Sequence, residues 1–185
     1  MYPKEERGNN RNIKFAPEFP DKKENKQGVD QMKENILSAL KEFKAESGNL
    51  LRPSNLFMTY IMIFPDISAT LAPTTIDRVQ TELKSLFVES FLMLGEFHPL
   101  NNSEGLRNPN FRPLRSPIPL LVIRHMMPTD IVFLAWDKYP SEFQRNLVIS
   151  FLKRFEGTHS DEYKVALQKL EEIENNLKEE SMKYS

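Results

Sequence analysis

Residues 56–64 read LFMTYIMIF, and this run decides the fold because both of its alternating faces are apolar and rich in aromatic and branched side chains. Pro65 ends the run, since proline cannot donate a backbone hydrogen bond to a neighbouring strand. The pattern predicts a central strand that is covered on both faces. Helices that cover this strand should therefore flank it in the sequence.

Helices are predicted where apolar residues recur three and four positions apart, with polar residues on the opposite side. Such stretches run from 30 to 48, 76 to 91, 141 to 156 and 160 to 177, with a further helix start after Pro128. Two more strands are predicted at 92–98 and 120–126. This order predicts an α+β fold, in which a small sheet of about three to four strands is covered by amphipathic helices.

The first 30 residues differ in composition from the rest. They are rich in charged residues, Asn and Pro and hold only isolated apolar residues, so they bury too little surface to fold alone. We expect residues 1–30 to be a flexible N-terminal arm. Residues 31–185 should form a single α+β domain with a long proline-rich loop at 99–119.

Composition excludes several classes of function. The 185 residues include 25 basic and 26 acidic side chains, so no overall field attracts the protein to nucleic acid or an anionic membrane. Cysteine is absent, which excludes disulfides and thiolate metal ligands. No segment has the ~20 apolar residues of a membrane span. We expect a cytoplasmic protein with a small-molecule ligand and no nucleic-acid or membrane partner, and we keep a homodimer open.

The loop at 99–119 is the expected place for chemistry. It contains five prolines, and long loops in compact domains usually serve a site, so we interpret it as a lid or binding loop. His98 precedes it, and Arg124 and His125 follow it in the next predicted strand. Histidine carries protons or binds metals near neutral pH, and arginine binds anions.

Two histidines and a carboxylate are a candidate metal set. Glu96 and His98 should share one strand face, because side chains alternate along a strand. If the next strand pairs alongside, His125 approaches them and completes a set that suits non-haem iron or a similar metal. In the alternative, His98 caps a strand through a hydrogen bond, Glu96 is solvated and His125 is a half-buried structural residue.

The arginines are candidates for binding an anion. Arg115 and Ser116 lie between prolines that hold the backbone extended, so a guanidinium and a hydroxyl are presented from a stiff segment. In the alternative, Arg115 pairs with an acid such as Asp130 and ties the loop to the sheet. Arg124 interrupts an apolar strand and needs the rim or a buried partner. It should face away from the histidine that follows it, unless a bulge intervenes.

Two resemblances add to these patterns. At FHP (97–99) and RSPIP (115–119), with Arg124 behind them, residues 56–155 resemble small bacterial domains of unassigned function. A looser resemblance is to haem proteins of the YqcI/YcgG type, whose relatives include enzymes that oxidise amino-acid nitrogen. The matching residues are Gly95, His98, Pro99, Arg112, Arg115, Pro119 and Leu120. Those proteins have a Phe-Pro-Cys segment implicated in haem ligation, where this chain has FPD at 64–66. A haem here would need a histidine as its axial ligand.

We therefore expect a small-molecule tailoring enzyme, in one form an oxidoreductase dependent on haem or iron. The alternatives are a domain that binds a small ligand without turnover and a protein-interaction domain. Trp136 and Tyr139 are either a stacking surface or the closed edge of a core. By role, the candidate residues are His98, Arg115 and Arg124 for catalysis, His98 and His125 as cofactor ligands, Arg112, Arg115 and Ser116 for substrate binding, and Glu96, His98 and His125 as metal ligands.

Overall fold

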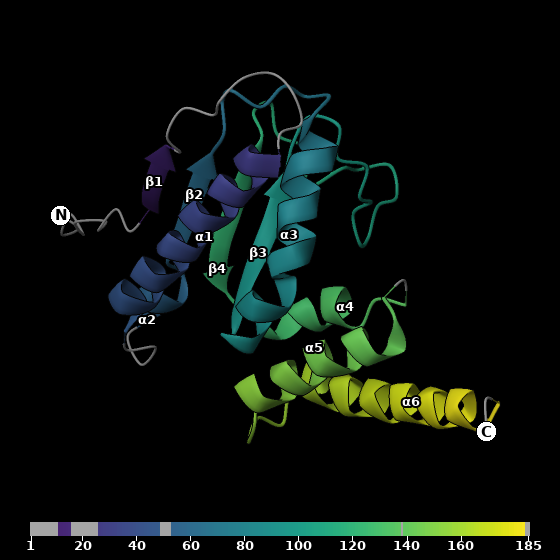
Figure 1. Cartoon of the computed structure of the whole chain (residues 1–185). Helices are drawn as coiled ribbons and strands as arrows, with labels where there is room; N and C mark the ends of the chain where they lie inside the picture. Colours follow the sequence, from purple (N-terminus) through teal and green to yellow (C-terminus); the bar gives the residue numbers. More distant parts are fainter. Residues whose placement is uncertain (1–10, 16–25, 49–52, 138, 184–185) are drawn as a thin grey trace. The chain divides into compact units, whose positions relative to one another are not determined.

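The structure is a computed structural model that describes residues 11–15, 26–48, 53–137 and 139–183. Figure 1 shows its helices and strands. They are β1 (Arg11–Phe15), α1 (Lys26–Ser47), α2 (Pro53–Leu56), β2 (Thr59–Ile63), α3 (Ala72–Glu89), β3 (Leu92–Phe97), β4 (Leu120–His125), the 3₁₀ turn η1 (Pro128–Asp130), α4 (Ile131–Leu134), α5 (Ser141–Arg154) and α6 (Asp161–Lys183). This order confirms the predicted α+β fold class.

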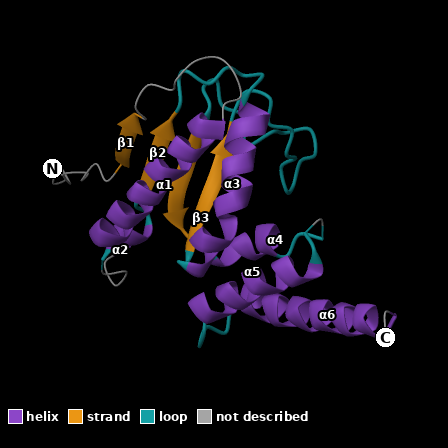
Figure 2. Cartoon of the chain, in the orientation of Figure 1, coloured by secondary structure: helices purple, strands orange, loops and turns teal. Residues whose placement is uncertain are grey.

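One sheet has its strands in the order β1-β2-β4-β3 (Figure 2). β1 pairs with β2 in parallel, with Ile13 beside Ile61, and β2 pairs with β4 antiparallel, with Ile61 opposite Val122. The predicted strands 56–64, 92–98 and 120–126 are confirmed as β2, β3 and β4 within a few residues.

The composition does not predict β1, which lies inside the segment expected to be a flexible arm. Its five residues include only two apolar ones, Ile13 and Phe15, so it gains its place through backbone pairing with β2. α1 also begins earlier than expected, at Lys26. The other residues of the expected arm lie outside the described residues.

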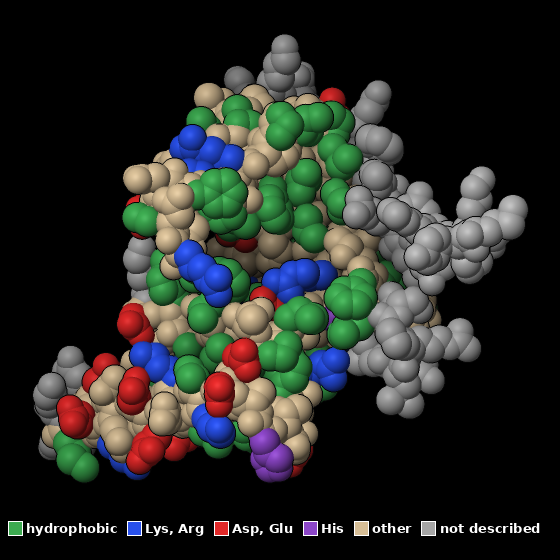
Figure 3. Space-filling model, turned by 180° about the vertical axis from the view of Figure 1, so that it is seen from behind, with side chains coloured by type: hydrophobic (Ala, Val, Ile, Leu, Met, Phe, Trp, Pro, Cys, Tyr) green, Lys and Arg blue, Asp and Glu red, His purple; other side chains and the backbone are tan. Residues whose placement is uncertain are grey.

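The prediction that residues 56–64 are covered on both faces was wrong. In β2, Tyr60 and Met62 are buried and the alternate residues are half-buried, and β4 alternates in the same way. Helices α1 and α3 lie over one face of the sheet (Figures 1 and 2). Figure 3, seen from behind, shows hydrophobic side chains gathered over the other face. The physical reason is that a sheet with antiparallel strands can leave one face partly open to solvent.

The chain divides into two compact units. Unit 1 comprises residues up to 83 and 94–125, and unit 2 comprises 84–93 and 126–185. Unit 1 therefore holds most of the sheet, α1 and the start of α3, and unit 2 holds α4, α5 and α6. One domain over 31–185 stays a prediction.

Unit 2 is built around the apolar faces of α5 and α6. The apolar spacing predicts the buried stripe of Leu147 and Phe151 on α5, and both side chains are buried. The core cluster consists of Val88, Met93, Met126, Ile131, Leu134, Leu147, Val148, Phe151, Leu152, Ala166 and Ile173. Arg145 on α5 also pairs with Glu174 on α6 at 3.3 Å. In the part of the chain that the structure describes, no helix has the length and apolar character needed to cross a membrane.

Candidate functional site

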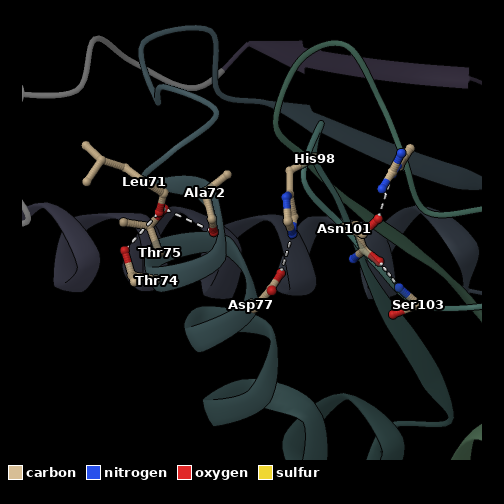
Figure 4. A network of polar contacts seen from close by, with 9 residues as sticks. Leu71, Ala72, Thr74, Thr75, Asp77, His98, Asn101 and Ser103 are labelled. Carbon is tan, nitrogen blue, oxygen red and sulfur yellow. Dashed lines mark hydrogen bonds and ion pairs between the residues drawn. The ribbon is translucent and has the colours of Figure 1, made fainter. Parts of the chain in front are cut away.

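A buried histidine and a half-exposed aspartate form the centre of the site. His98 follows β3 and is only 1% exposed, and its Nε2 lies 3.0 Å from Oδ1 of Asp77 on α3 (Figure 4). The Asp77 side chain is 41% exposed. When Asp77 is ionised, the Nε2–H of His98 donates to it. The pair therefore joins a buried imidazole to a carboxyl that solvent reaches.

The second nitrogen of His98 has a different environment. Nδ1 is buried and has no hydrogen-bond partner within the ranges that the structure describes. Most buried polar atoms are bonded, and one without a partner commonly marks a place for a water, an ion or a chemical role. With Nε2 as the donor to Asp77, Nδ1 keeps a lone pair. This atom can accept a proton or bind a metal.

Asp77 has a perturbed pKa. Burial raises the pKa of its carboxyl above the ordinary 3.8, whereas the charge and the hydrogen bond of His98 act to lower it. The net direction is upward, so the folded protein holds the Asp77 proton more tightly than the unfolded chain does. The stability that this proton contributes is present at low pH and is lost as the pH rises through the raised pKa.

Asp77→Asn should remove this pH dependence. As the pH rises from about 3 to about 6, the free energy of unfolding of the wild type should fall relative to that of the variant, because the wild-type carboxyl ionises more easily when unfolded. The change should stay under about 1 kcal/mol, since solvent screens a half-exposed group. Urea unfolding at several pH values measures it. A difference that grows in the opposite direction would show that the attraction of His98 outweighs burial.

The loop at 99–119 folds back on His98 through its backbone. The backbone N–H of His98 donates to the carbonyl of Leu114 at 3.3 Å, and the carbonyl of His98 accepts from Asn101 at 3.2 Å and from Ser116 at 3.5 Å. No helix or strand lies between Phe97 and Leu120. The backbone of His98, at the centre of the site, therefore holds the loop in place where the loop begins.

Arg115 is fixed by two neutral oxygens. Its Nε donates to the carbonyl of Asn101 at 3.0 Å, and its Nη2 donates to Oδ1 of Asn102 at 2.9 Å. Figure 4 places Asn101 beside His98. Both partners are uncharged, whereas the alternative from the sequence was an acid such as Asp130. The positive charge of Arg115 is therefore not balanced by a described carboxylate.

The other two residues predicted to bind substrate are engaged locally. Arg112 donates to the carbonyls of Pro109 and Phe111, and its Nη2 lies 3.6 Å from a carboxylate oxygen of Glu104. Ser116 Oγ donates to the carbonyl of Ile118 at 2.7 Å. With three arginines and one glutamate between 99 and 119, the loop has a net charge of +2 (3 − 1).

The structure does not bring Glu96, His98 and His125 together, and no cluster of three potential metal-ligating side chains occurs among the described residues. Strand direction explains why. The N–H of Met126, after β4, bonds to the carbonyl of Phe91, before β3, so the two strands run antiparallel. His98 at the end of β3 therefore lies near the start of β4, and His125 ends β4, which spans about 17 Å.

His125 and Arg124 lie on opposite faces, as strand alternation predicts. His125 is buried, and its ring packs on Phe43 of α1 with the centroids 5.0 Å apart. Arg124 is half-buried, and its Nη1 donates to the carbonyl of His125 at 3.0 Å. Neither side chain therefore lies at the Asp77–His98 pair.

Asp77 is the site residue that the sequence analysis missed, because it belongs to the polar side of the helix predicted at 76–91. The sequence nevertheless contains a signal for the contact between Asp77 and His98. α3 and β3 are consecutive and joined by a tight turn, so they run antiparallel. Asp77 lies 12 residues before the end of α3 at Glu89, or about 18 Å. His98 lies six residues after the start of β3 at Leu92, or about 20 Å. The two residues therefore lie at about the same distance from the turn that joins α3 to β3.

Residues 9–166 match a family described as a domain of unknown function, DUF6875. No curated protein and no solved structure matches the chain. The match agrees with the expected family of unassigned function, whereas the shared motif layout and the resemblance to YqcI/YcgG-type proteins stay predictions.

Proposed function

The chain belongs to the DUF6875 family of domains of unknown function, and from its site we propose that it is a small-molecule enzyme that binds an anionic substrate and transfers a proton. The observation that carries the proposal is the buried imidazole of His98, which bonds to Asp77 through Nε2 and has no described partner at Nδ1. Histidine and carboxyl groups held in hydrogen-bond contact are the usual means of general acid–base catalysis.

Each residue has a distinct role in this proposal. Asp77 is the catalytic group, since its exposed carboxyl reaches a bound molecule and its pKa is raised by burial. His98 is a positioning residue that fixes the carboxyl. Arg115 binds the anionic group of the substrate, because its guanidinium is held in place by neutral oxygens and keeps its charge uncompensated by any described acid. We also propose a cytoplasmic location, which the absence of cysteine favours.

An oxidative form of the proposal uses the same histidine. Haem or iron would need a ligand, and His98 Nδ1 supplies a buried nitrogen with a lone pair. The hydrogen bond from the other ring nitrogen to Asp77 would orient such a ligand, as carboxylates do at many metal sites. Iron bound at this point would supply one-electron chemistry.

Deuterium exchange tests the acid–base form. A panel of small 2-oxo acids, which carry an anionic group and acidic C–H bonds, is incubated with the protein in D2O, and loss of the C–H signal is followed by NMR. The wild type should accelerate exchange of at least one member, because an oriented carboxyl typically contributes ~10²–10⁴-fold to proton transfer. Asp77→Asn should abolish this exchange, and Arg115→Gln should raise the concentration needed for half-maximal rate.

Matched controls keep the roles separate. Asp66→Asn removes an exposed carboxyl outside the site and should leave exchange unchanged. Stabilisation of the wild type by an oxo acid without exchange would contradict catalysis and support the alternative, a domain that binds without turnover. For the oxidative form, added haem should give a sharp absorption band that His98→Ala loses. A spectrum that haem leaves unchanged removes that form only.

A second candidate function is protein interaction, and one observation favours it. The lobe at 104–112 is braced by its own hydrogen bonds, including Gly105 N–H to the carbonyl of Phe111 at 2.9 Å. It nevertheless exposes Leu106 and Phe111. A rigid lobe with exposed apolar side chains suits recognition of another protein. This function would be favoured if the oxo acids neither exchange nor stabilise the protein.

A further inference from the structure

Unit 2 contains a buried lysine that the proposed function does not use. Lys84 on α3 is 8% exposed, although lysine is rarely buried without a charged partner. Its Nζ contacts the hydroxyl of Tyr139 in the segment between α4 and α5. No carboxylate of the described chain pairs with Lys84. Tyr139 meets the lysine twice, since its hydroxyl contacts Nζ and the centroid of its ring lies 4.6 Å from Nζ.

A second lysine contacts the same segment, but its partners are carboxylates. Lys169 on α6 pairs with Asp137 at 2.8 Å and with Glu172 at 3.2 Å. The hydrogen bond to Asp137 holds the pKa of Lys169 above 10.5. Asp137 and Tyr139 are two residues apart, so one short segment carries a carboxylate for one lysine and a phenol for the other. This contrast makes Lys169 an internal reference for Lys84.

Aromatic rings surround the lysine-bound tyrosine. The ring of Tyr139 meets Trp136 with centroids 5.8 Å apart and Phe143 with centroids 5.3 Å apart, both edge to face. Trp136 is 48% exposed. The phenol therefore sits between a partly buried apolar ring, Phe143, and one that solvent reaches, Trp136, which gives a small apolar molecule a surface to approach.

We propose that Lys84 and Tyr139 form a reactive amine site for a small aldehyde or ketone. The nitrogen of Lys84 attacks the carbonyl carbon, a C–N bond forms, and the electron pair of the carbonyl π bond moves to oxygen, which takes the hydroxyl proton of Tyr139. Tyr139 recovers a proton from nitrogen. Loss of water then gives the imine, so that amine and carbonyl compound become imine and water with no oxidant or reductant. A lysine in apolar surroundings and an adjacent proton donor are what this chemistry requires.

Reductive trapping tests the site in the full chain. The protein is treated with limiting acetaldehyde and cyanoborohydride, and the ethylation of each lysine is measured by peptide mass mapping. The same reaction in concentrated urea gives the reactivity of each lysine when unfolded. Folding should accelerate labelling of Lys84 by about tenfold or more, equivalent to ~1.4 kcal/mol in activation free energy. Folding should slow labelling of Lys169, because its amine is held in ion pairs.

Variants decide the role of the phenol. Tyr139→Phe removes only the hydroxyl and should return Lys84 labelling toward its unfolded rate while leaving Lys169 unchanged. The exposed Lys164, paired with Asp161, reports on an ion-paired lysine that solvent reaches. If Lys84 is labelled more slowly folded than unfolded, the reactive site is overturned. If Lys84 is fast and Tyr139→Phe leaves it fast, the assignment of proton transfer to Tyr139 is overturned.

Discussion

A chain cut after Ala166 should lose the folded structure of unit 2. The cut keeps only the first six residues of α6 and removes Ile173, which is buried in the core cluster, together with the partly buried Leu170 and Leu177. Each such side chain contributes about 1.5–3 kcal/mol when fully buried. Their loss therefore approaches the ~5–15 kcal/mol by which whole domains are stable. Phe151 and its neighbours on α5 would be left exposed.

Circular dichroism and hydrogen exchange measure this loss. Helical signal should fall by more than the removed residues account for, and amides of α5 should lose protection. A chain cut after Lys178 is the control, because residues 179–182, which the structure describes at the end of α6, are exposed, and this chain should unfold at nearly the wild-type urea concentration. Protected α5 amides in the shorter chain would show that α5 packs stably without α6.

Periodicity predicted most of the helices, because a helix that buries one face has apolar residues at regular spacing in the sequence. The stripe of Leu147 and Phe151 identifies α5 without any knowledge of its partner. β1 has no such apolar pattern, since Arg11–Phe15 is held by backbone hydrogen bonds to β2. Any residue except proline can form these hydrogen bonds. The pattern of apolar residues indicates which side of a helix or strand is buried, and it says little about which strands pair through their backbones.

The candidate site was predicted in part for the same reason. His98 and the loop after it were identified from residue type and proline content. Asp77 was missed because the helix and the strand that its contact joins were interpreted separately, although the tight turn between them fixes their relative direction. His125 shows the reverse error: its residue type suggested a ligand, but antiparallel pairing places it at the far end of β4 from His98. Residue types indicate which side chains could form a site, and strand direction determines which of them lie close together.

Phe43→Ala should destabilise unit 1 by about 3–5 kcal/mol, the usual loss for a phenylalanine removed from a core. Phe43 on α1 is fully buried, and its ring lies 5.2 Å from that of Tyr60 on β2 and 5.0 Å from that of His125 on β4. Its removal therefore opens a cavity between α1 and two strands. Urea unfolding measures the cost.

Phe57→Ala is the matched control, since Phe57 is 73% exposed and the same atoms removed from a solvated position should cost less than about 0.5 kcal/mol. Similar costs at the two positions would mean that Phe43 is not packed as described. The result also bears on His125. If Phe43→Ala costs several kcal/mol, the ring that covers His125 belongs to a tightly packed core. His125 would then serve packing between α1 and β4.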